Sequence, residues 1–201
     1  METNDPTLLT QEIAEQFLAD FESVDLSEFT TMTDEAARIL PNDQDDLPLE
    51  GLTSLSDAAA ASLANHQAGL LLQGLTEISD EAVKSLAKVQ GKLHLGGLTA
   101  LSDAAAEALS THKGILYLPK VTQISDKALE TLASHEGDLD LSGLTTLSPQ
   151  AAEALANNSH FLLLFGLKNL SDEAAEALSK RKAGSYLSKD AEIAIQRVKA
   201  K

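Results

Sequence analysis

A repeat with a period of 23 residues constrains the fold of this chain more than any other feature. Its signature is an apolar residue followed by serine and aspartate, as in Leu55-Ser56-Asp57, and no insertion or deletion interrupts the spacing. Five close copies and two degenerate ones begin at Met32, Leu55, Ile78, Leu101, Ile124, Leu147 and Leu170. Seven uninterrupted copies predict a stacked-repeat architecture in which each coil packs on the next.

The first part of each repeat alternates leucine with other residues, as in Leu70-Leu71-Leu72 and Leu93-His94-Leu95. This period of two predicts a short strand whose recurring leucines face the core, and one strand per coil gives a parallel sheet. Val24-Asp25-Leu26 and Leu47-Pro48-Leu49 fill the same columns nearer the N-terminus. Pro48 is unusual there, because proline cannot donate a hydrogen bond within a sheet.

The second part of each repeat predicts a helix that begins after the serine. The serine hydroxyl is a good N-cap, the following aspartate complements the helix dipole, and Pro149 suits the first helical position. An alanine three residues after the cap and a leucine seven residues after it recur in every copy and share one helix face. We expect that face to pack on the sheet, and we expect helices to end near Gly91, Gly114 and Gly137.

The two ends of the chain depart from the repeat, and we expect both to cap it. Apolar residues at helical spacing between Thr7 and Phe21 predict a helix outside the repeat. Ile193, Ile195 and Val198 predict a final helix that partly covers the last coil.

These patterns together predict one continuous domain. We assign residues 1–22 to an N-terminal helical cap, 23–187 to the repeats and 188–201 to a C-terminal capping helix. The expected α/β fold is a right-handed, curved solenoid of about seven strand–helix repeats, with a parallel sheet on its inner face and helices outside.

Composition and charge argue against several classes of function. The formal net charge of −16 disfavours nucleic acid as a partner, because phosphate binding needs clustered lysine and arginine, and it also disfavours an anionic membrane surface. With no cysteine, the chain forms neither a disulfide nor a thiolate metal site. The longest apolar run, 161–165, is too short to cross a bilayer, and the N-terminus lacks the pattern of a secretion signal. The compartment stays open, with the cytoplasm slightly favoured.

The strand–helix unit resembles the leucine-rich repeat family. The resemblance lies in the Leu-x-Leu strands and in the step Gly51-Leu52-Thr53-Ser54-Leu55-Ser56-Asp57, and it extends over roughly residues 24–187. The chain departs from the family pattern at Leu52 and its equivalents, which replace the asparagine that usually follows the strand. Short, alanine-rich repeats of this kind look bacterial. The resemblance implies a scaffold that binds protein partners and has no catalysis of its own.

The residues between the core leucines would point out from the inner sheet surface and form the candidate binding site. Residues 161–165 are the most unusual, since Phe161, Leu163 and Phe165 would all face water, and exposed apolar groups usually mark an interface. We therefore predict a non-enzymatic protein–protein interaction scaffold that binds its partner through this surface, biased to the C-terminal half. The predicted contact residues are Lys92, His94, Ile115, Tyr117, Asp138, Asp140, Phe161, Leu163, Phe165 and Tyr186.

Two other functions stay open. The apolar patch or an end coil could pair two copies into a homodimer, which would make the protein a structural or self-assembling repeat. Alternatively, Asp138 and Asp140 could hold a cation or act as acid and base in an enzyme. His94 lies two coils from Asp140 and therefore about 10 Å away, too far for a direct hydrogen bond.

Two further columns of residues are interpreted as structural. His66, His112 and His135 stand at helix exits, where Val89 and Asn158 take the same place in other coils, so the fold does not depend on histidine there. A threonine follows most strands and is expected to hydrogen-bond the turn into the helix. No nucleophile motif, phosphate loop or cofactor fingerprint is present, so we predict no catalytic residue, no metal and no cofactor.

Overall fold

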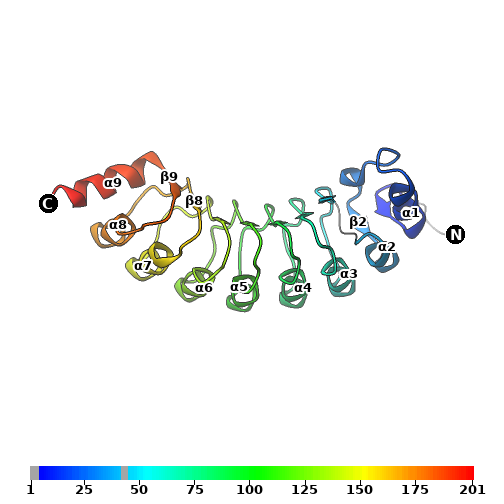
Figure 1. Cartoon of the computed structure of the whole chain (residues 1–201), viewed down its shortest axis with the longest axis horizontal. Helices are drawn as coiled ribbons and strands as arrows, with labels where there is room; N and C mark the ends of the chain where they lie inside the picture. Colours follow the sequence, from blue (N-terminus) through cyan, green and yellow to red (C-terminus); the bar gives the residue numbers. More distant parts are fainter. Residues whose placement is uncertain (1–4, 42–44) are drawn as a thin grey trace. The chain divides into compact units, whose positions relative to one another are not determined.

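The computed structural model describes residues 5–41 and 45–201 and confirms an α/β fold of repeated strand–helix coils. The chain divides into two compact units, the first ending at Leu98 and the second beginning at Thr99. Within each unit, short strands lie side by side and each helix returns the chain to the next strand (Figure 1).

The first unit contains two sets of parallel strands. β1 (Leu8–Leu9) pairs with β2 (Thr31–Met32), while β3 (Leu47–Pro48), β4 (Leu70–Leu71) and β5 (Leu93–His94) lie side by side in that order. The helices are α1 (Gln11–Ala19), α2 (Asp34–Ile39), α3 (Asp57–Leu63) and α4 (Asp80–Leu86), with a 3-10 helix η1 (Leu26–Glu28) before β2.

The second unit continues the same alternation. Its parallel strands are β6 (Leu116–Tyr117), β7 (Leu139–Asp140), β8 (Leu162–Leu164) and β9 (Ser185–Leu187), paired in that order. Its helices are α5 (Asp103–Ser110), α6 (Asp126–Leu132), α7 (Pro149–Asn157), α8 (Asp172–Ser179) and α9 (Lys189–Lys199).

The core consists of the leucine and alanine columns that the sequence predicts. Strands pair in the expected register, with Leu47 opposite Leu70 and Leu139 opposite Leu162, and these leucines are buried. The alanine three residues after each cap and the leucine seven residues after it are buried as well. Each fully buried leucine side chain stabilises the fold by about 1.5–3 kcal/mol.

The helix starts also agree with the sequence. In every repeat the capping hydroxyl accepts a hydrogen bond from the N–H three residues later, as Ser56 does from Ala59 at 2.9 Å. Pro149 occupies the first turn of α7 after its cap Ser148.

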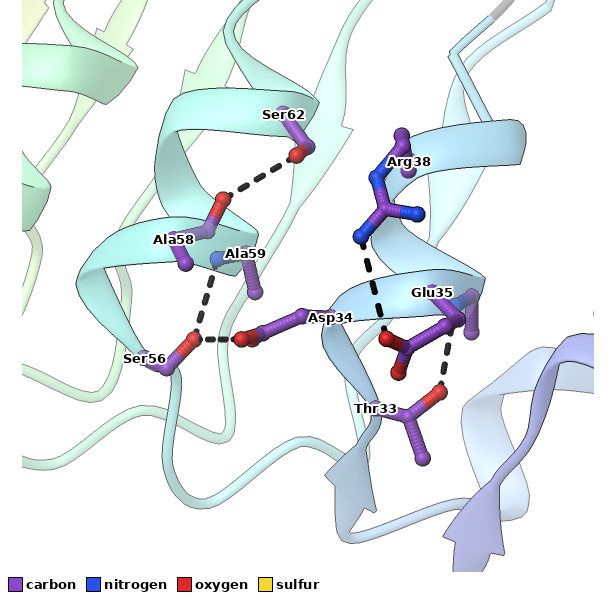
Figure 2. A network of polar contacts seen from close by, with 9 residues as sticks. Thr33, Asp34, Glu35, Arg38, Ser56, Ala58, Ala59 and Ser62 are labelled. Carbon is purple, nitrogen blue, oxygen red and sulfur yellow. Dashed lines mark hydrogen bonds and ion pairs between the residues drawn. The ribbon is translucent and has the colours of Figure 1, made fainter.

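The capping serines have a second partner that the sequence analysis did not anticipate. Ser56 Oγ donates to Asp34 Oδ1 of the preceding coil at 2.5 Å (Figure 2), and Ser125 Oγ donates to Asp103 Oδ1 at 2.6 Å. Ser79 makes the same bond to Asp57. We call this row of bonds the Ser–Asp ladder. These aspartates lie in the first turn of their own helices, where they complement the helix dipole, and they also tie those helix starts to the next coil.

Pro48 is accommodated because β3 begins its sheet. Leu47 and Leu49 donate their N–H groups to Gly69 and Leu71 of the neighbouring coil. The nitrogen of Pro48 lies between these two donors in the chain and therefore faces away from β4. The N–H that proline lacks is consequently not needed for pairing with β4.

The helix predicted over 7–21 is present as α1, but it begins later than expected, and the residues before it pair with a strand of the repeat. Leu8 and Leu9 form a strand in register with Thr31 and Met32, and α1 begins only after the cap Thr10. The segment is therefore a degenerate strand–helix coil. Its place in the repeat is obscured because it lacks the aspartate and alanine of the other copies.

The strand expected at Val24-Asp25-Leu26 is also absent, and η1 takes its place. Asp25 Oδ1 accepts hydrogen bonds from the Ser27 N–H at 2.9 Å and from the Ser27 hydroxyl at 2.6 Å. This local turn competes successfully with strand pairing, as short aspartate side chains commonly do.

The glycines predicted to end the helices have a different role. α4 and α6 end at Leu86 and Leu132, several residues before Gly91 and Gly137, and no glycine in the described residues has positive φ. A side chain at Gly91 would place its Cβ 2.5 Å from the carbonyl oxygen of Ala68 in the previous coil. These positions need glycine because neighbouring backbones approach closely.

The C-terminal helix begins at Lys189, within the segment 188–201 assigned to it, and follows β9 with Ser188 as its cap. Ile195 is buried as predicted, but Ile193 is 58% exposed and does not cover the last coil. Arg197 pairs with Asp172 of α8, and Lys201 Nζ lies 2.6 Å from the same carboxylate. These hydrogen bonds lower the pKa of Asp172 and hold α9 against the start of α8.

A candidate interaction surface on the sheet

The outward row of the second unit's sheet is assembled by strand register. Tyr117 lies opposite Asp140, Asp140 opposite Leu163, and Leu163 opposite Tyr186. The residues before and after Tyr117, Asp140 and Leu163, such as Leu116 and Leu118, are buried. The alternation predicted from the sequence therefore places these four side chains on one face.

Three aromatic side chains gather at the end of this face nearest the C-terminus, and we call them the aromatic cluster: Phe161, Phe165 and Tyr186. The Phe161 and Tyr186 rings meet edge to face at 5.0 Å, and Phe165 and Tyr186 stack at 5.8 Å. Phe165 and Tyr186 remain 55% and 58% exposed, while Phe161 and Leu163 are half-buried. Apolar rings held together yet open to water are characteristic of an interaction surface.

The aspartates beside the cluster are held by backbone hydrogen bonds. Asp138 Oδ1 accepts from the Phe161 N–H at 2.9 Å, which links two adjacent coils. Asp140 Oδ1 accepts from the N–H and hydroxyl of Ser142 at 2.9 and 2.5 Å. Each carboxylate therefore has a defined position, although Asp138 is exposed.

Ile115 and Tyr117 extend the apolar part of the face on the other side of the aspartates. Ile115 is 38% exposed and Tyr117 is half-buried. Eight of the ten predicted contact residues thus belong to the second unit, where the outward positions combine apolar side chains with acidic ones.

Lys92 and His94 belong to the first unit, and each is described there. Lys92 Nζ lies 2.5 Å from Asp46 Oδ2, and Asp46 Oδ1 accepts from the Gly69 N–H at 2.7 Å. The hydrogen bond from Lys92 lowers the pKa of Asp46. His94 is half-buried in β5, opposite Leu71.

This ion pair spans three coils, because Gly69 lies between its members. A Cβ at Gly69 would stand 2.5 Å from Lys92 Cγ, so the glycine leaves room for the lysine to lie flat across the neighbouring strand. Sequence reasoning missed the pair. The sequence feature that could have revealed it is that Asp46, Gly69 and Lys92 occupy the same position of three successive repeats.

The column at the helix exits is buried and structural. The His112 and His135 rings stack at 5.8 Å with nearly parallel planes, and His135 Nε2 lies 3.0 Å from the Gly114 carbonyl oxygen. Asn158, one coil further, donates to the carbonyls of Ala133 and His135 at 2.9 Å. Burial lowers the pKa of His135.

Arg181 takes the same position in the next coil and completes this column. Its guanidinium donates to the carbonyls of Leu155 and Asn158 at 2.5 and 2.7 Å, and also to those of His160 and Gly184. A polar side chain at the helix exit therefore satisfies carbonyl oxygens that the helix itself leaves without partners. Within residues 5–41 and 45–201, no group of three or more histidine, aspartate or glutamate side chains could hold a metal ion.

The threonine column is likewise used within the fold. Thr53 Oγ1 donates to the Thr30 carbonyl at 3.1 Å, and Thr122 Oγ1 donates to the Thr99 carbonyl at 3.5 Å. These bonds join the turns of adjacent coils, whereas the sequence predicted that the threonines hydrogen-bond the turn within their own repeat.

A hollow lies at the C-terminal end of the second unit. It has a volume of about 680 Å³ and is lined by residues of α8, β9 and α9, among them Leu178, Leu187, Ile193 and Ile195. Within this unit, α9 starts directly after β9, whereas a longer connection separates β6, β7 and β8 from the helices that follow them.

A scan against protein-family models finds no match to this chain, and a search of curated proteins finds none either. None of the helices in the described residues is long and apolar enough to cross a membrane.

Proposed function

We propose that this protein is a non-enzymatic binding module of the leucine-rich repeat kind, which recognises a partner protein through the outward sheet face of its second unit. The observation that carries the proposal is the aromatic cluster, where Phe165 and Tyr186 remain more than half exposed although they stack on each other. Aromatic anchors of this kind dominate the energetics of protein interfaces.

The rest of the face supports recognition better than catalysis. Asp138 and Asp140 each accept hydrogen bonds from the backbone, so they have a structural use beside the cluster. Ile115 and Tyr117 continue the apolar surface on the far side of these aspartates. A central apolar patch with polar residues among it is the composition expected of a protein interface.

The test compares the wild-type protein with a Leu163→Glu, Phe165→Glu variant in a pull-down from cell lysate. A matched control, Thr146→Glu, Gln150→Glu, adds the same charge at exposed positions off the sheet face. Circular dichroism must first show that all three proteins are equally folded. We expect one partner to be captured by the wild type and the control and lost by the sheet variant.

Two other results would redirect the proposal. A partner retained by the sheet variant would place the binding site on the helices or the ends. A mass that rises with concentration in the wild type and stays monomeric in the sheet variant would favour the second candidate, a homodimer formed through the same aromatic cluster.

A further inference from the structure

The position directly before each strand is occupied by different residues in the two units. Asp46, Gly69 and Lys92 precede β3, β4 and β5 in the first unit, directly before the paired residues Leu47, Leu70 and Leu93. In the second unit the equivalent positions before β7, β8 and β9 hold Asp138, Phe161 and Gly184.

The carboxylate is set in the same way in both units. Asp46 Oδ1 accepts the N–H of the next coil's residue, Gly69, at 2.7 Å, and Asp138 Oδ1 accepts that of Phe161 at 2.9 Å. One oxygen is thereby fixed by the backbone. In the first unit the other oxygen, Asp46 Oδ2, binds the ammonium of Lys92.

The second unit lacks the cation. The position of Lys92 is taken by Gly184, which has no side chain, and no ion pair from the part of the chain that the structure describes reaches Asp138. The outward strand positions of this unit carry no lysine or arginine at all, from Ile115 to Tyr186. The Asp138 carboxylate is therefore fixed on an exposed face, and no side chain of the outward strand positions supplies it with a counter-charge.

An aromatic ring lies over Gly184, the glycine that takes the position of Lys92 in the second unit. A Cβ at Gly184 would lie 2.7 Å from two ring carbons of Phe161, so the Phe161 ring lies over this glycine. Tyr186 contacts the same ring edge to face.

We propose that the partner supplies the missing cation: this surface binds a protein segment in which a lysine or arginine side chain is flanked by apolar residues. The cationic group bonds to Asp138 as Lys92 bonds to Asp46, and the apolar flanks cover Phe165 and Tyr186. The inference rests on the proposed function and specifies its partner. The formal net charge of −16 favours the approach of such a basic segment.

A second copy of this chain fits the surface less well. Two copies meeting through this face would bring Asp138 and Asp140 near identical carboxylates, and like charges across an interface oppose association. A basic, apolar segment satisfies both the charge and the exposed rings.

The experiment uses a displayed library of random short peptides, selected on the folded wild-type protein. We expect selected peptides to contain lysine or arginine next to aromatic or aliphatic residues. For one such peptide and its Lys→Gln or Arg→Gln analogue, affinities are measured against wild type and Asp138→Asn. Asp138→Asn should weaken the basic peptide by roughly three- to tenfold and leave the neutral analogue unchanged.

A transplanted pair gives an independent arm. The variant Phe161→Gly, Gly184→Lys reproduces the Asp46–Gly69–Lys92 arrangement in the second unit and supplies Asp138 with an internal cation. It should lose the preference for the basic peptide over its neutral analogue, whereas Phe161→Gly alone should keep that preference. Melting temperatures of both variants establish that they are folded.

The outcomes separate this inference from the proposed function. Selected peptides without basic residues, or equal effects of Asp138→Asn on both peptides, overturn the inference if binding is still lost in Phe165→Ser, Tyr186→Ser. If no peptide is selected whose binding depends on Phe165 and Tyr186, the proposed function fails together with the inference.

Discussion

The Ser–Asp ladder leads to a measurable difference between two serines that look alike in the sequence. Ser56 Oγ accepts from the Ala59 N–H at 2.9 Å and donates to Asp34 at 2.5 Å (Figure 2). Ser171 Oγ accepts from the Ala174 N–H at 3.1 Å in the same way. The residue of the preceding coil that would accept from Ser171 is Pro149, which has no acceptor in its side chain. Ser171 therefore caps its helix without a rung of the ladder.

The expected losses in the free energy of unfolding follow from the hydrogen bonds that each substitution removes. Removing a serine N-cap costs about 1 kcal/mol, so Ser171→Ala should lower the free energy of unfolding by about that amount. Ser56→Ala also loses the bond between coils, which is worth about another 1 kcal/mol, for a total of about 2 kcal/mol. Urea denaturation followed by circular dichroism measures both losses.

A double-mutant cycle isolates the bond between coils. Ser56→Ala and Asp34→Ala are measured singly and together, and we expect a coupling energy of about 1 kcal/mol because each substitution alone already removes the shared bond. Equal losses for Ser56→Ala and Ser171→Ala, together with no coupling to Asp34, would refute the ladder. The aspartates would then act only on the dipole of their own helices.

Three further predictions address packing, pH and charge. Gly91→Ala should destabilise the protein by about 1–3 kcal/mol in urea denaturation, because its Cβ would meet the backbone of the previous coil, whereas Gly184→Ala meets only a movable ring and should change stability little. Burial lowers the pKa of His135 from 6.5, so the unfolded chain binds the proton more readily. Stability should therefore fall as the pH drops below about 6.5, and His135→Asn should reduce that slope in denaturation curves taken at several pH values. Lys92→Met should raise the pKa of Asp46 toward 3.8, measured by NMR titration of the carboxyl carbon; an unchanged pKa would contradict the ion pair.

Most of the fold could be predicted from the sequence because each coil repeats one local rule. A hydroxyl before a helix, an alanine and a leucine on one helix face, and alternating leucines in a strand are short-range patterns, and identical coils reinforce them. Two of the predictions that failed lie where the pattern is weakest. Thr10 caps α1 without the usual aspartate, and Asp25 forms a local turn in place of a strand.

The candidate site was predicted in part. Alternation in the strands was enough to place Tyr117, Leu163 and Tyr186 on one face. It was not enough to show that Phe161 lies over Gly184, or that Lys92 is already engaged by Asp46. Those facts depend on which side chains lie flat across a neighbouring coil.

The sequence by itself determined the period, the alternation of strand and helix, the caps and the identity of the core. Only the tertiary structure decided why Gly91 must lack a side chain, why serine and aspartate recur together, and which carboxylates have a cation. The reason is physical: the sequence period relates residues along the chain, whereas these properties depend on atoms of adjacent coils that approach within hydrogen-bonding distance only after stacking.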